Sequence, residues 1–377
     1  MPLHLGLLAK IAEDSTIDAL SFKTAKELYD QFWNYKQYKL RERLGCSVQW
    51  THVIDSLCDY MNSQQQQSLS APERVVDDFA DDARAMASEH ILVWEGKRIS
   101  FFHESFFDYA FARRFASRGQ ELLRFLRSSE QHLFRRAQLR QILIHQREDD
   151  EDDFDYYVEN LQELLTSSDI RFHLKKVVIA LLATLDKPTE EECEIIAQLM
   201  CDESNPLTQE VWIVLNSSIH WFKLLDSLGI IKRWLRDKNE KRVDKTVILL
   251  SFMQKQVPDR VAELLEPFVG VSENWSKRLV NLIGFAEFST GRRFFDLFLR
   301  LIDMGVLDDQ VGDGTTRRDF WSHIYDLPKQ NPEWACEAMS HYLNRRLNIS
   351  LAAGNSNPFD NDSGAFPYSV SYKKKFK

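Results

Sequence analysis

The stretch ILVWEGKRISFFHESFFDYAFARRF, residues 91–115, decides the predicted fold. Residues 91–94 are Ile, Leu, Val and Trp, which favour a strand, and residues 99–102 offer a second short strand. Glu95 and Gly96 stand between them, and a glycine readily adopts the positive φ that a tight hairpin turn needs. We therefore predict a β-hairpin, or wing, at this point of the chain.

The hydrophobic period changes directly after the hairpin. From Glu104 onward Phe107, Ala110, Phe111 and Phe115 recur at helical spacing, whereas the charged residues fall on other faces. Glycine and proline are scarce, with 13 and 10 among 377 residues, which favours a mostly α protein. A hairpin that leads straight into an aromatic helix, within a helical chain, predicts a winged-helix domain.

The end of this stretch carries a longer motif. Residues 101–113 read FFHESFFDYAFAR and match F-x-H-x-S-F-x-[DE]-Y-x-x-A-[RK]. This motif resembles the end of the winged helix in the NACHT/STAND signal-transducing ATPases. In that family the histidine contacts the β-phosphate of bound ADP and holds the protein in its resting state, so the resemblance implies that role for His103.

The N-terminal segment carries two further parts of the same resemblance. Met1-Pro2-Leu3-His4-Leu5 resembles the family's G-L-P-L segment, in which the proline packs near the adenine. Pro2 is then the counterpart, although the preceding glycine is missing. Residues 20–44 resemble the helix that joins the helical lid of the ATPase to the winged helix.

The chain lacks the motifs that would hold a nucleotide. No G-x-x-x-x-G-K-[ST] phosphate loop occurs, and Gly96-Lys97-Arg98 lacks both the first glycine and the hydroxyl residue. Residues 75–78 are a poor Walker B strand, because residues 72–88 read better as one helix that begins at Pro72 after a loop at residues 64–70. We expect no ATPase activity and no cofactor for this chain alone. The resemblance implies ATP or ADP with Mg²⁺ in the intact family architecture.

Composition and charge narrow the class of protein. The chain is 44% hydrophobic with a formal net charge of −9, which is typical of a soluble globular protein and disfavours broad, non-specific binding to nucleic acid. The five cysteines show no C-x-x-C spacing, which disfavours disulfides and a zinc site and favours a cytoplasmic location. The histidines form no H-x-x-x-H pattern, and G-x-S-x-G is absent, so no catalytic or metal residue is predicted.

A run of arginines follows the aromatic helix. Arginines on successive helical turns could follow phosphates, which predicts a candidate anion or nucleic-acid face. The plainer interpretation is a solvated or domain-facing surface, since no base-reading pattern accompanies them. The acidic run at residues 148–153 either folds back on these arginines or acts as a linker. The candidates are Arg113, Arg114, Arg118, Arg124, Arg127, Arg135, Arg136 and Arg140.

Beyond Phe154 one amphipathic helix follows another, including a predicted single helix over residues 222–234. Three helix starts resemble one another: Pro258 follows Pro188 by 70 residues, and Pro332 follows Pro258 by 74. Each separation is near twice a helix-pair repeat of about 34 to 40 residues. Such pairs bury their apolar faces against their neighbours and stack into a superhelix, which predicts a HEAT- or TPR-like α-solenoid.

The predicted fold class is mostly α, with a winged-helix domain and its small β-hairpin followed by an α-solenoid of HEAT/TPR-like helix pairs. The four predicted parts are a remnant of the ATPase helical lid (1–44), the winged helix (45–118), the solenoid (119–350) and a tail whose composition is typical of disorder (351–377).

The expected function is that of a regulatory and sensor fragment of a STAND ATPase in immune or antiphage signalling. Its expected partners are a protein trigger or a nucleotide-binding domain, with a homo-oligomer as the activated form in the family. The alternatives are a stand-alone α-solenoid adaptor for protein interactions and a winged-helix protein that binds nucleic acid. No membrane association is expected, because the longest apolar run, residues 177–185, is too short to cross a bilayer.

Overall fold

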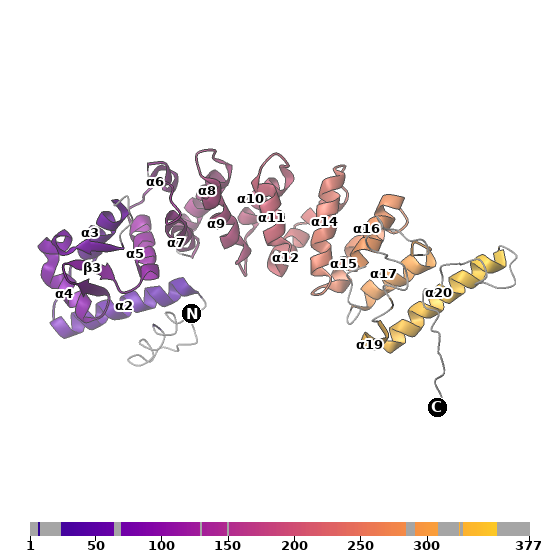
Figure 1. Cartoon of the computed structure of the whole chain (residues 1–377), viewed down its shortest axis with the longest axis horizontal. Helices are drawn as coiled ribbons and strands as arrows, with labels where there is room; N and C mark the ends of the chain where they lie inside the picture. The colour runs from indigo at the N-terminus through magenta and orange to yellow at the C-terminus, as the bar shows by residue number, and fades with distance from the viewer. Residues whose placement is uncertain are drawn as a thin grey trace, which may run out of the picture. The chain divides into compact units, whose positions relative to one another are not determined.

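The structure is a computed structural model that describes residues 7, 24–63, 69–128, 130–148, 151–283, 291–307, 324 and 327–352 (Figure 1). Pro2 and the predicted tail beyond residue 352 lie outside these ranges. The described residues are mostly helical with one small three-stranded antiparallel sheet, which confirms the mostly α prediction. The chain divides into two compact units, Met1–Leu185 and Asp186–Lys377. No described helix combines the length and the apolar character needed to cross a membrane.

Unit 1 holds the sheet and the first helices of the chain. Its elements are α2 (Ala25–Leu44), α3 (Trp50–Ser63), β1 (Ser70–Pro72), the 3-10 helix η1 (Glu73–Phe79), α4 (Ala80–Ser88), β2 (Leu92–Glu95), β3 (Arg98–Phe101), α5 (Glu104–Ser117), α6 (Leu122–Ser128), α7 (Arg135–Glu148), α8 (Glu151–Thr166) and α9 (Phe172–Ala183). The ends of α2 follow from its sequence. Thr24 Oγ1 accepts a hydrogen bond from the Glu27 N–H at 3.1 Å, and Gly45 ends the helix at a φ of 66°.

The predicted hairpin is present. Strands β2 and β3 pair antiparallel, with Leu92 opposite Phe101 and Glu95 opposite Arg98, and Gly96 takes a φ of 62° in the turn. A third strand, β1, pairs with the other side of β3, so the strand order is β1-β3-β2. Figure 1 shows β3 beside α5 at the N-terminal end of the coloured ribbon.

The prediction of one helix over residues 72–88 was wrong. Pro72 is extended at a φ of −65° and a ψ of 146°, and Val76 breaks the helical path at a φ of −117°. The region therefore forms β1, η1 and α4 in turn. Strand β1 depends on a distant partner, because the fully buried Ala71 lies opposite Ile99 in the sheet. Three residues carry too short a pattern to reveal such a pairing.

An aromatic core joins α2 to α5. The rings of Tyr29 and Tyr109 stack with centroids 5.1 Å apart, and Phe32 meets Phe106 edge-on at 5.7 Å. Trp33 packs against the same two α5 rings, and all of these side chains are buried. Buried aromatic pairs contribute about 0.5–1.5 kcal/mol each beyond the area that they bury. Helix α2 thus belongs to the same core as the hairpin and α5.

A buried ion pair fixes the other end of α2. Lys36 Nζ lies 3.1 Å from one carboxylate oxygen of Glu89, and Arg43 lies 2.9 Å from the other. The Lys36 and Glu89 side chains are only 7% and 8% exposed. Breaking a buried pair of this kind typically costs roughly 3 to 5 kcal/mol, because the remaining charge stays buried without compensation.

Unit 2 is a series of helices. Its elements are α10 (Glu190–Cys201), α11 (Leu207–Leu215), α12 (Ile219–Ser227), α13 (Ile230–Leu235), α14 (Glu240–Met253), α15 (Pro258–Leu265), the 3-10 helix η2 (Glu266–Phe268), α16 (Glu273–Ile283), α17 (Arg292–Asp303), α19 (Leu327–Gln330) and α20 (Pro332–Ala352). Thr189 and Glu192 form a capping box at the start of α10. The single helix predicted over residues 222–234 is two helices, because Gly229 takes a φ of 69° between α12 and α13.

Hydrogen bonds with one recurring sequence offset link the helices of unit 2. Helix α14 packs on α16, and α15 packs on α17, as Figure 1 shows. Three aspartates each accept from a residue that lies 34 positions later in the chain. The three pairs are Asp226 with Arg260, Asp244 with Arg278, and Asp259 with the backbone N–H of Arg293. The same offset thus links α12 to α15, α14 to α16 and α15 to α17.

Candidate functional site

His103 is the N-cap residue of α5, directly after the hairpin. Its backbone is extended, with a φ of −155° and a ψ of 145°, and its Nδ1 accepts a hydrogen bond from the Ser105 N–H at 3.1 Å. The first N–H groups of a helix have no partner within the helix, and a capping side chain usually supplies an oxygen acceptor. Here the imidazole nitrogen supplies the acceptor instead.

The cap fixes which nitrogen of His103 carries the proton. A ring nitrogen that accepts a hydrogen bond is unprotonated, so the neutral imidazole holds its proton on Nε2. The side chain is half-buried, and Nε2 has no partner among the described residues. The ring is thus oriented by the helix start and offers one N–H donor, a suitable arrangement for binding an anionic oxygen.

One polar network joins α2 to α5 next to the aromatic core. The hydroxyl of Tyr109 donates to Asp30 Oδ1 at 2.5 Å, and Arg113 Nη1 lies 2.7 Å from the same oxygen. Burial raises the pKa of the Tyr109 hydroxyl well above its usual range, which keeps it protonated as a donor. Lys26 also pairs with Asp30 at 3.0 Å, and the Arg113 guanidinium lies 5.1 Å from the Trp33 ring centroid.

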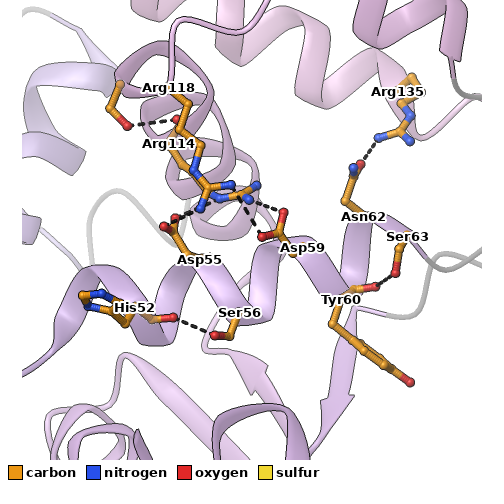
Figure 2. Close-up of polar contacts among 11 residues, drawn as sticks. His52, Asp55, Ser56, Asp59, Tyr60, Asn62, Ser63, Arg114, Arg118 and Arg135 are labelled. Carbon is orange, nitrogen blue, oxygen red and sulfur yellow. Dashed lines mark hydrogen bonds and ion pairs between the residues drawn. The ribbon is translucent and has the colours of Figure 1, made fainter. Parts of the chain in front are cut away.

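A second network joins α3 to α5. Figure 2 shows the guanidinium groups of Arg114 and Arg118 directed toward Asp55 and Asp59. Arg114 Nε lies 2.8 Å from Asp55 Oδ1, its Nη2 contacts Asp59, and Arg118 lies 2.5 Å from Asp55 Oδ2. Arg114 is only 6% exposed, so these carboxylates compensate a buried charge. Cys58 is enclosed at the same helix junction, and burial raises the pKa of its thiol, so it stays protonated and unreactive.

Arg135, on α7, is a buried cation of a different kind. Its guanidinium donates to the side-chain oxygens of Asn62 and Gln138 and lies 4.7 Å from the Phe125 ring centroid. Figure 2 shows the contact with Asn62. No carboxylate among the described residues pairs with it, and burial lowers the pKa of the guanidinium. This arginine holds α3 and α7 together rather than facing solvent.

The other candidate arginines lie apart from these networks. Arg124 pairs with Glu121 at 3.2 Å, and Arg127 pairs with Asp169 at 3.1 Å. Arg136 and Arg140 lie one turn apart on α7, are exposed and have no partner among the described residues. The structure thus brings Arg114 and Arg118 together around aspartates and leaves two guanidinium groups open. Few of the candidate arginines are therefore free to bind a phosphate group.

The sequence contained a signal for the second network that our sequence analysis missed. Asp55 and Asp59 are four residues apart, as are Arg114 and Arg118, so each pair projects from one face of its helix. Two acids and two bases at matched helical spacing predict facing helices. The match between the two pairs was missed because the aspartates and the arginines lie far apart in the sequence.

Comparison with known proteins finds no family model that matches this chain and no curated protein that is significantly similar to it. Among the described residues, no three His, Cys, Asp or Glu side chains gather as the ligands of a metal ion would. The geometry of His103 and the repeating contacts of unit 2 are the features from which a function can be inferred.

Proposed function

We propose that this chain is the regulatory and sensor part of a STAND-type signal-transducing ATPase, completed by a nucleotide-binding domain outside this sequence. The observation that carries the proposal is the hydrogen bonding of the His103 ring. The histidine of the F-x-H-x-S-F motif is held by Ser105 with its Nε2–H available. A phosphate contact requires a donor of this kind at the junction of wing and helix.

The order of elements in unit 1 supports a winged helix. Helix α3 is followed by β1, then by η1 and α4, and finally by the β2–β3 hairpin. The third strand returns to the middle of the sheet, between β1 and β2. Helix α5, with His103 at its start, then continues from the hairpin as the sequence motif requires.

The 34-residue offset in unit 2 supports a helical-repeat sensor. The offset recurs at Asp226, Asp244 and Asp259, and it matches the length of one helix-pair repeat. Repeat arrays of this type expose long surfaces and commonly bind other proteins. A protein trigger is therefore the partner that we propose for unit 2.

The residues of this chain cannot form a nucleotide-binding site without another domain. The sequence has no phosphate loop, and one imidazole cannot replace the backbone amides that surround phosphates in such loops. We propose no ATP hydrolysis by this chain itself. Binding to nucleic acid is a weaker proposal, because Arg113, Arg114 and Arg118 are already paired with carboxylates.

The experiment begins with the coding sequence around this chain and with its binding partners, to identify the domain that carries the phosphate loop. In that assembly we expect His103→Ala to weaken ADP binding roughly ten- to hundredfold, as loss of a hydrogen bond to a charged group would. His132→Ala, at another half-buried histidine of unit 1, is the matched control. Unchanged ADP binding in His103→Ala, or tight ADP binding by the isolated chain, would contradict the proposal.

A further inference from the structure

A cavity of about 430 Å³ lies in unit 1, where the connection between α5 and α6 approaches α8. Its volume is within the range of about 300 to 1,000 Å³ that is usual for ligand sites. The residues that line it and matter here are Glu121, Gln146, Tyr156, Glu159, Asn160 and Glu163. His103 and the paired arginines do not line it, so the cavity is separate from the site described above.

The charged residues that line this cavity are all acidic, and one of them, Glu121, also pairs with Arg124, which does not line it. Glu121, Glu159 and Glu163 line it, and none of its lining residues is Lys or Arg. Glu159 and Glu163 lie one turn apart on α8, and neither carboxylate has a partner among the described residues. Like charges at this spacing repel each other. A cation in the cavity would therefore be attracted by both carboxylates.

The cavity also contains a buried donor. Gln146 is 6% exposed, and its Oε1 accepts from Asn160 Nδ2 at 3.2 Å. Its amide nitrogen has no acceptor among the described residues, although the residue lines the cavity. A ligand that fits must then bring an acceptor such as a carbonyl group as well as its positive charge. Tyr156, 61% exposed, adds a ring on which a planar cation can stack.

We propose that this cavity binds an arginine side chain of a partner peptide, with the guanidinium group at the glutamates and a peptide carbonyl at Gln146. A guanidinium group carries five donors in a plane, so it can bond two neighbouring carboxylates such as Glu159 and Glu163 at once better than a compact ammonium group does. A metal ion is a poorer occupant, because these glutamates do not gather as metal ligands would. The inference does not depend on the proposed ATPase family.

Calorimetric titration with three probes tests this inference. The probes are N-acetyl-arginine methylamide, the equivalent blocked lysine and free L-arginine. We expect saturable binding of the blocked arginine and binding of the blocked lysine that is at least about tenfold weaker. Free arginine should bind weakly, since its charged α-ammonium and α-carboxylate groups must lose water where the blocked form presents neutral peptide groups. If free arginine binds as tightly as the blocked form, the proposed peptide ligand is wrong and the cavity binds a free amino acid instead.

Variants at exposed positions locate the site without disturbing the core. Glu159→Gln combined with Glu163→Gln should weaken the blocked arginine at least about tenfold, and Tyr156→Ala should weaken it several-fold. Glu191→Gln, at an exposed glutamate of unit 2, is the control and should bind as the wild type does. No saturable binding to the wild type, equal binding of the blocked lysine, or equal binding by the double variant would overturn the proposal.

Discussion

Arg260 and Asp226 are joined by two parallel hydrogen bonds, of 2.7 Å from Nε and 2.9 Å from Nη2, although they lie 34 residues apart in the chain. A bidentate pair of this kind adds geometric specificity to its electrostatic strength. The pair links α15 to α12, and its sequence offset recurs along unit 2. It is therefore the contact at which the link between α12 and α15 can be tested.

Arg260→Met should lower the free energy of unfolding by roughly 1 to 3 kcal/mol, because Asp226, whose side chain is 13% exposed, would keep its charge without its partner. Urea denaturation measures this change. Arg233→Met, at an exposed arginine of α13, is the control and should change stability by less than about 0.5 kcal/mol. A double-mutant cycle with Asp226→Asn that shows simple additivity would mean that the two side chains do not interact.

Arg114→Leu should destabilise the protein by roughly 3 to 5 kcal/mol, since it removes the buried cation that compensates Asp55 and Asp59. Thermal or urea unfolding monitored by circular dichroism gives the difference. Arg140→Leu removes an exposed guanidinium group from α7 and should have little effect. Equal effects of the two substitutions would show that the network between α3 and α5 adds no stability.

Asp108 should make stability depend on pH. Burial, reinforced by the negative charge of Glu104, raises the pKa of this carboxyl from 3.8 to about 7. Between these values the folded state holds a proton that the unfolded state has lost, so stability falls as pH rises through this window and levels off above about pH 7.

Asp108→Asn should remove this dependence and stabilise the protein above neutral pH, because the amide carries no charge into the buried site. Urea midpoints at about pH 5 and about pH 8 provide the comparison. Asp155→Asn, at an exposed position of α8, should leave the dependence as it is. If Asp108→Asn retains the wild-type fall in stability between these two pH values, another group is responsible.

His90 has a φ of 59°, the one positive φ at a non-glycine position among the described residues. The left-handed conformation costs a side-chain-bearing residue roughly 1 to 2 kcal/mol, and a β-branched side chain fits it worst. His90→Val should therefore lower the free energy of unfolding by about 1 kcal/mol or more, whereas His90→Gly should not lower it. Equal unfolding midpoints for the two variants would show that this backbone is not strained.

Local signals in the sequence predicted much of the fold. Gly96 marked the hairpin turn, and the spacing of Phe107, Phe111 and Phe115 marked α5; each signal acts through neighbours within a few residues. Strand β1 was missed, because Ala71 becomes extended only through pairing with a strand almost thirty residues later.

The candidate site was less predictable for the same reason. The motif around His103 identified the residue, but its hydrogen bond to Ser105 and the resulting proton position required the backbone of the helix start. The arginines were visible as a charged run, yet their partners Asp30, Asp55 and Asp59 lie on earlier helices. A charge pattern gives the sign of a surface and does not show which charges the fold has already neutralised.

The attachment of α2 at both ends has a mechanical consequence. Asp30 ties one end of the helix to α5, and Lys36 with Arg43 ties the other to Glu89 beside the hairpin. We therefore expect α2, the β2–β3 hairpin and α5 to move as one rigid body. A force applied to the chain ahead of Thr24 would then be transmitted to His103 through rigid contacts and not through a flexible connection.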